Sequence, residues 1–89
     1  MQVPRSHRSD IDVLFQEARA VEMLANEADV EPTKLQEYWA IAADLITLTA
    51  DIEALQAASP SAGYDDPQLL ELRRRLRQIT SRLADVSAP

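Results

Sequence analysis

The stretch "LLELRRRLRQITSRLADV", residues 69–86, decides the fold because its apolar residues recur at alternating intervals of three and four. This spacing is that of the a and d positions of a heptad, which place one apolar edge along an α-helix. Two earlier stretches repeat the pattern, again with six positions each. The three sets are Ile11, Leu14, Ala18, Val21, Ala25 and Ala28; Tyr38, Ile41, Leu45, Leu48, Ile52 and Leu55; and Leu69, Leu72, Leu76, Ile79, Leu83 and Val86.

Helix start signals precede each of the three sets. Ser9 is a suitable N-cap for the first helix, because its hydroxyl can accept a hydrogen bond from the first turn. Thr33 with Gln36 has the spacing of a capping box. Asp66 followed by Pro67 matches an N-cap with proline at the first helical position, where the missing N–H costs nothing. The signals therefore predict three helix starts, at Ser9, Thr33 and Asp66.

The sequence predicts an all-α fold, an antiparallel three-helix bundle with coiled-coil-like packing. Matched seams of six positions favour helices lying side by side, and short connections between them favour antiparallel neighbours. A dimer of such bundles is an open alternative. The predicted helices span about 9–29, 33–58 and 66–86, within a single helical domain at 9–86 and between flexible ends at 1–8 and 87–89.

The composition limits how such a small domain can be stabilised and indicates its location in the cell. The chain has 89 residues, no cysteine and one glycine. Disulfides and thiolate metal sites are therefore excluded, and oligomerisation remains as support for a small core. No apolar run is long enough to cross a membrane, and the first residues lack the apolar segment of a signal peptide. We expect no membrane contact and a cytoplasmic location.

Charge is divided between the predicted helices. The formal net charge is −6, yet four of the eight arginines lie within residues 73–77. The first two helices are acidic and the third is basic, and both kinds of charge flank the apolar seams. We therefore interpret Arg73, Arg75 and Arg82 as internal partners of acidic residues on the other helices.

Arg74 and Arg77 lie away from the third seam and remain for an external acidic partner. One alternative function is a small nucleic-acid-binding or antitoxin-like regulator that uses this arginine-rich helix. The net charge of −6 disfavours that alternative, because it repels the phosphate backbone that supplies most non-specific affinity. No helix-turn-helix pattern with a polar recognition helix is found.

The second helix has more apolar residues than one seam needs. Leu35, Trp39, Ala42, Ile46 and Thr49 form a second stripe at helical spacing. One explanation is that the middle helix of a bundle contacts two neighbours and needs a wide apolar face. The other is a surface for self-association or for a partner protein. For that surface the sequence nominates Phe15, Leu24, Leu35, Trp39 and Ile46, with Arg74 and Arg77 as the charged contacts.

Catalytic chemistry finds little support in the sequence. His7 is the single histidine and lies in the predicted N-terminal tail, and no cysteine is available as a nucleophile. One glycine does not make a glycine-rich phosphate loop. We expect no enzyme activity, no cofactor and no metal site. The sequence instead favours a non-catalytic protein–protein interaction or assembly module, with a homodimer or another protein as partner.

Overall fold

Three α-helices and one 3-10 turn make up the computed structural model, which describes residues 9–87. The elements are α1 (Asp10–Glu27), η1 (Pro32–Lys34), α2 (Leu35–Ala58) and α3 (Pro67–Val86). Within the described range there is no strand, and the β contact that is present is an isolated bridge between Val30 and Ser87. The all-helical prediction is confirmed. The tail predicted at residues 1–8, and residues 88–89 of the tail predicted at 87–89, lie outside the described residues. Ser87 of the second tail is described, as the C-cap of α3 and the bridge partner of Val30.

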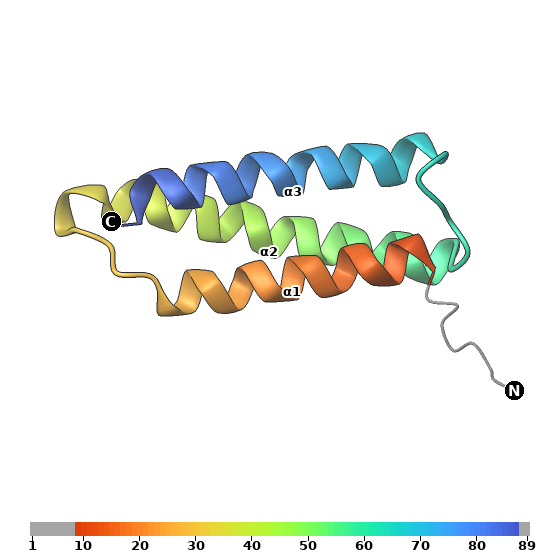
Figure 1. Cartoon of the computed structure of the whole chain (residues 1–89), viewed down its shortest axis with the longest axis horizontal. Coiled ribbons are helices and arrows are strands. Elements are labelled where there is room, and N and C mark those ends of the chain that lie inside the picture. The colour runs from red at the N-terminus through yellow and green to blue at the C-terminus, as the bar shows by residue number, and fades with distance from the viewer. Residues whose placement is uncertain (1–8, 88–89) are drawn as a thin grey trace, which may run out of the picture.

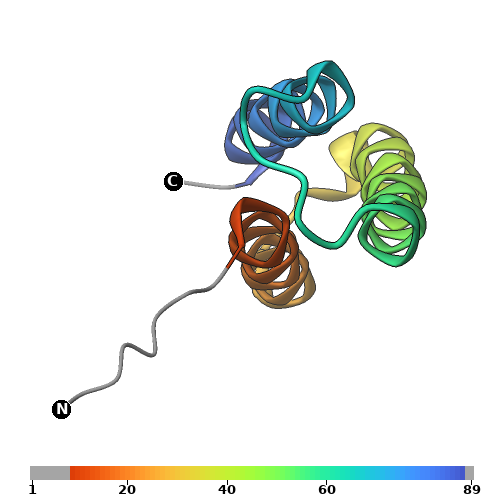
Figure 2. The same ribbon diagram turned by 90° about the vertical axis from the view of Figure 1, so that its right-hand side faces the viewer.

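The helices form a bundle of three rods. In Figure 1 the three helices lie side by side along the long axis of the molecule. Seen end-on in Figure 2, the rods lie at the corners of a triangle, and the α2–α3 connection crosses one end of the bundle near the start of α1. The backbone N–H of Tyr64 in that connection donates a hydrogen bond of 3.0 Å to the Asp10 carboxylate. This contact fixes the loop against α1.

The core lies along the axis between the three rods. Every residue in it comes from the heptad positions, and each helix contributes at least five of them. Sixteen of the eighteen predicted seam residues are buried, while Tyr38 and Ala28 are partly buried. Tyr38 stays near the rim because its hydroxyl donates a hydrogen bond of 2.6 Å to the Ala25 carbonyl, at the end of α1. The heptad pattern therefore located the core.

Two of the three predicted N-caps are present. The Ser9 hydroxyl accepts a hydrogen bond of 3.3 Å from the Asp12 N–H. The Asp66 carboxylate accepts one of 2.8 Å from the Gln68 N–H, with Pro67 in the first turn of α3. Each cap satisfies a backbone donor that has no partner inside its helix.

The boundaries between α1 and α2 differ from the prediction. Thr33 is not an N-cap, because Pro32 starts a tight 3-10 turn closed by the Lys34 N–H and the Glu31 carbonyl at 2.9 Å. α2 begins only at Leu35 and has no side-chain cap. α1 ends at Glu27 rather than at residue 29. The backbone then becomes extended, as the bridge of Val30 to Ser87 requires.

Candidate protein interaction surface

Helix α2 has two opposite apolar faces. One face supplies five buried core residues: Ile41, Leu45, Leu48, Ile52 and Leu55. The other is fully exposed and follows its own heptad, at intervals of four, three, four, three and four. We call this second set the outer stripe; it consists of Trp39, Ala43, Ile46, Ala50, Glu53 and Ala57.

Two large side chains dominate the outer stripe. Trp39 is 62% exposed and Ile46 is 67% exposed. Trp39 precedes the buried Ile41 by two residues, a rotation of about 200° on an α-helix, so it points away from the core. Ile46 follows Trp39 by seven residues, about two turns, and therefore lies on the same line. A helix that is apolar on opposite sides is more typical of a fully covered position than of a surface helix.

The charges of α2 lie mostly off the outer stripe. Asp44 and Asp51 face α3, where their carboxylates accept hydrogen bonds of 2.7 and 2.8 Å from Arg82 and Arg75. Glu37 lines a groove between α2 and α3 that also contains Lys34 and Arg82. Glu53 is the one charged residue of the outer stripe. An acidic chain thus keeps one long surface almost free of charge.

The predicted apolar residues are not all on one surface. Trp39 and Ile46 share the outer stripe, while Leu35 is partly buried at the start of α2. Phe15 packs against the core, with the Arg19 guanidinium 5.9 Å from its ring centroid. Leu24 is 59% exposed but lines a groove between α1 and α3. The five residues therefore divide between different sides of the bundle.

The groove between α1 and α3 is a second exposed apolar feature. These two helices contact each other less than either contacts α2. One part of the groove, of about 420 Å³, contains Val21 and Leu76. The next part, of about 380 Å³, contains Leu83 and has Leu24 at its edge.

The predicted internal pairing of α3 is present for two arginines. Arg75 and Arg82 form ion pairs with Asp51 and Asp44 of α2. Arg73, by contrast, forms no ion pair within residues 9–87, although an acidic partner on a neighbouring seam was predicted. Its guanidinium lies 4.5 Å from the ring centroid of Tyr64, in a cation–π contact. The loop supplies this aromatic partner because Asp10 holds the Tyr64 backbone in place.

The outward arginines differ from each other. Arg74 donates hydrogen bonds of 3.0 and 2.6 Å to the two carboxylate oxygens of Glu71. These hydrogen bonds, supported by the positive charges of Arg74 and Arg75, lower the pKa of Glu71, and the Glu71 carboxylate raises the pKa of Arg74. Arg77 lines the α1–α3 groove near Glu17 and forms no ion pair within residues 9–87. Arg77 is thus the freer of the two predicted charged contacts.

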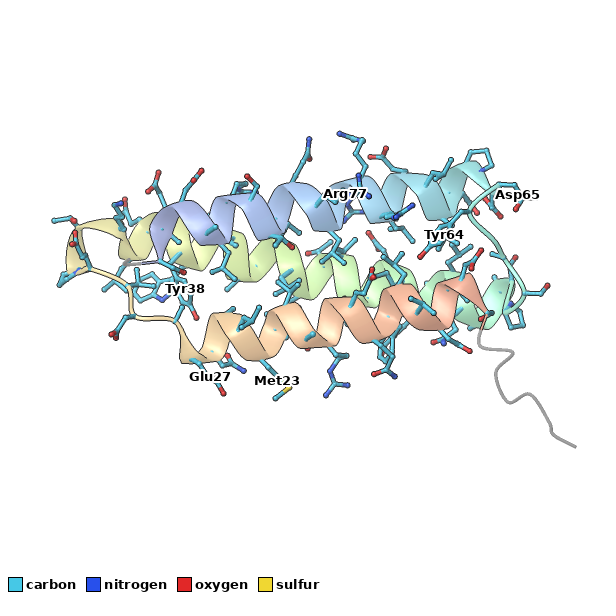
Figure 3. All side chains as sticks on the ribbon, in the orientation of Figure 1. Met23, Glu27, Tyr38, Tyr64, Asp65 and Arg77 are labelled. Carbon is cyan, nitrogen blue, oxygen red and sulfur yellow. The ribbon has the colours of Figure 1, made fainter. Side chains whose placement is uncertain are left out.

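Figure 3 shows how labelled side chains lie relative to the bundle. Met23 and Glu27 point away from α2 and α3, and Tyr38 lies among the helix ends near the α1–α2 connection. Met23 is 63% exposed and is not one of the heptad positions of α1. The three alanines of the outer stripe were not recognised from the sequence. Their regular spacing of seven residues is the feature of the sequence from which they could have been identified.

The described residues contain neither a candidate metal site nor a candidate membrane span. Within residues 9–87, histidine, aspartate and glutamate side chains form no cluster of three that could hold a metal ion. His7 lies outside the described residues. None of the helices in the described part of the chain combines the length and the apolar character that a membrane span needs.

Comparison with protein-family models, with curated proteins and with solved structures found no match for this chain.

Proposed function

We propose that this chain is a non-catalytic protein–protein interaction or assembly module that binds through the outer stripe of α2. The observation that carries the proposal is the exposure of Trp39 and Ile46, two turns apart, on a helix whose opposite face already fills the core. Aromatic residues are favoured anchors at protein interfaces. Covering the stripe removes apolar surface from water without disturbing the core.

The module is an antiparallel three-helix bundle with coiled-coil-like packing. Support comes from contacts between α1 and α2, where Asp12 meets Gln56 while Ala25 meets Tyr38. Residue numbers therefore fall along α2 as they rise along α1. The ion pairs of α2 with α3 follow the same rule, because Asp44 meets Arg82 and Asp51 meets Arg75. Such a rigid scaffold presents α2 as a fixed surface. A chain without cysteine fits the reducing cytoplasm.

The test compares two baits that differ only on the outer stripe. Wild type and the double variant Trp39→Lys/Ile46→Lys are immobilised and incubated with extract of the native host, and retained proteins are identified by mass spectrometry. Circular dichroism first checks that both baits fold, which we expect because both positions are exposed. We expect proteins that wild type retains and the variant does not. Identical sets from two folded baits would contradict the use of this surface.

Nucleic-acid binding has less support. Within the described residues, Arg74, Arg75 and Arg82 each contact a carboxylate, which reduces the positive charge available to phosphates. A low-salt gel shift with wild type and Arg74→Ala/Arg77→Ala tests this alternative. Absence of a shift at micromolar protein would exclude it, whereas a shift abolished by the double variant would support it.

A further inference from the structure

We propose that the outer stripe binds a second copy of this chain, with the two α2 helices antiparallel about a two-fold axis near residue 48. This inference rests on the proposed function and names its partner. The basis is the distribution of side-chain size along the stripe. One set of heptad positions carries Ala43, Ala50 and Ala57, while the alternate positions carry the larger residues Trp39, Ile46 and Glu53.

An antiparallel pair matches large residues with small ones. With the axis near residue 48, a residue on one copy faces the residue of the other copy that lies equally far from position 48 on the opposite side. Trp39 then meets Ala57 of the second copy, and Ile46 meets Ala50 of the second copy. The remaining layer places Glu53 opposite Ala43. Every layer therefore combines one alanine with one larger side chain, the arrangement that fills space between facing helices.

A parallel pair of the same helices fits less well. Each layer would then oppose identical residues, so that alanine faces alanine and Trp39 faces Trp39. Some layers would leave gaps and others would be overfilled, and both are unfavourable in packed helix interfaces. The pattern of large and small side chains is thus self-complementary in an antiparallel pair of α2 helices and not in a parallel pair. A two-fold axis needs just such a self-complementary surface.

A stable dimer would need to bury only a small part of the surface of each copy. The outer stripe spans nineteen residues, from Trp39 to Ala57, and the eighteen steps between its ends correspond to about 27 Å of helix. A specific interface buries at least about 1,200 Å² in total, or about 600 Å² per copy. That is about a tenth of the chain's 5875 Å² of accessible surface. One of three rods along the bundle can supply this fraction.

Charge does not oppose the dimer at the interface itself. The chain has a net charge of −6, so two copies repel each other at long range. Within the stripe, however, Glu53 is the one charged residue, and its opposing residue is an alanine rather than another acid. Asp44 and Asp51 are held by Arg82 and Arg75 on the side of α2 that faces α3. The stripe therefore escapes most of the repulsion.

Disulfide cross-linking tests the register, because the chain contains no natural cysteine. The double variant Ala43→Cys/Glu53→Cys places the two thiols in one antiparallel layer. Within one chain these positions are ten residues apart, about 15 Å along α2, which is too far for a disulfide. We expect a covalent dimer on a non-reducing gel after mild oxidation. The single variant Ala43→Cys should run mostly as a monomer on the same gel, because position 43 of one copy lies about 15 Å from position 43 of the other.

Sedimentation of the wild-type chain between about 1 and 200 µM tests the dimer without cysteines. Ala50→Lys should weaken association at least about tenfold, because it introduces a charge at the centre of the stripe. The matched control is Ala20→Lys, the same change at an exposed position of α1, which should associate like wild type. A wild-type monomer at every concentration, or cross-linking by Ala43→Cys alone as complete as that by the double variant, would overturn the inference. If that monomer still retains proteins in the bait experiment, the proposed function stands without the second copy.

Discussion

At the scale of single residues, the ion pairs between α2 and α3 determine orientation more than stability. The Arg75 guanidinium lies 2.8 Å from Asp51, and the Arg82 guanidinium lies 2.7 Å from Asp44. All four side chains remain substantially exposed, so that water screens the attraction. Their main effect is on the register of α3, because a shift of one to three residues would separate these two acids from these two arginines.

A double-mutant cycle on Arg75→Ala and Asp51→Ala should therefore give a small coupling energy. We expect about 0.2–1 kcal/mol in the free energy of unfolding, the range of exposed pairs. Urea denaturation of wild type, both single variants and the double variant measures it. A coupling energy well above that range would show that the pair is less screened by water than its exposure indicates.

The Glu71–Arg74 pair makes a second prediction at this scale, about pH. Hydrogen bonds from Arg74 lower the pKa of Glu71 below its ordinary 4.5. In the variant Arg74→Ala, an NMR titration should find that the pKa of Glu71 has risen toward the ordinary value. The matched control Arg77→Ala removes a charge that is not bonded to Glu71 and should change this pKa much less.

The sign of the stability effect follows from linkage. A carboxylate with a lowered folded-state pKa stabilises the fold fully above its unfolded pKa, and the contribution is lost as pH falls through the folded value. Because this pair is fully exposed, the contribution to stability is small. An unchanged Glu71 pKa in Arg74→Ala would show that the side chains are apart in solution.

Arg73 illustrates what residue patterns could not predict. Its heptad position indicated an acidic partner, but its guanidinium lies over Tyr64. Tyr64 belongs to the connection between α2 and α3, and heptad positions carry no information about how a loop folds back. The same reasoning predicted Arg75 and Arg82 correctly, because both partners lie on regular helices.

At the scale of the helices, caps separate the correct boundaries from the wrong ones. Ser9 and Asp66 cap α1 and α3, whereas Thr33 lies inside a 3-10 turn. Ser9→Ala and Asp66→Ala should each lower the free energy of unfolding by about 1 kcal/mol, the usual value of an N-cap. Thr33→Ala should change it by less than about 0.5 kcal/mol, as for surface substitutions without a special role. Thermal unfolding followed by circular dichroism measures all three.

The contrast among these variants is the informative result. If Thr33→Ala is as destabilising as Asp66→Ala, the capping box forms in solution and α2 begins earlier than Leu35. The sequence could not decide this point, because Thr33 and Gln36 have the correct spacing for a capping box. Pro32 starts the competing tight turn, and the bridge of Val30 to Ser87 draws the preceding backbone toward the end of α3.

At the scale of the whole molecule, the core was predictable and the exposed surface was not. Heptad spacing identified the buried residues because each helix in the bundle must bury one edge. The second stripe expected on α2 ran through Ala42 and Thr49, which are partly buried on the side of α1; Thr49, for instance, donates a hydrogen bond to Glu22. The outer stripe lies one step further round the helix. Its alanines are recognised as part of a stripe only once the buried face of α2 is known.

Stability of the whole assembly should depend on protein concentration if two copies pair through α2. Above the Kd, each tenfold rise in concentration stabilises a dimer by about 1.4 kcal/mol, or about 0.7 kcal/mol for each chain. For a domain of this size that corresponds to about 3–6 °C in Tm. Ala50→Lys should show the same rise in Tm only at concentrations at least about tenfold higher, because the added charge weakens pairing. Its single chain should fold normally, since Ala50 is exposed there.

Trp39 reports the same equilibrium, because it is the chain's one tryptophan and lies in the outer stripe. Its fluorescence emission should shift to longer wavelength as wild type is diluted, since separation of the copies returns the indole to water. In Ala50→Lys the same shift should occur at concentrations at least about tenfold higher, because its pairing is weaker. An emission maximum and a Tm that are both constant in wild type over a hundredfold dilution would show that Trp39 stays in one environment, and that the chain does not pair with itself in that range.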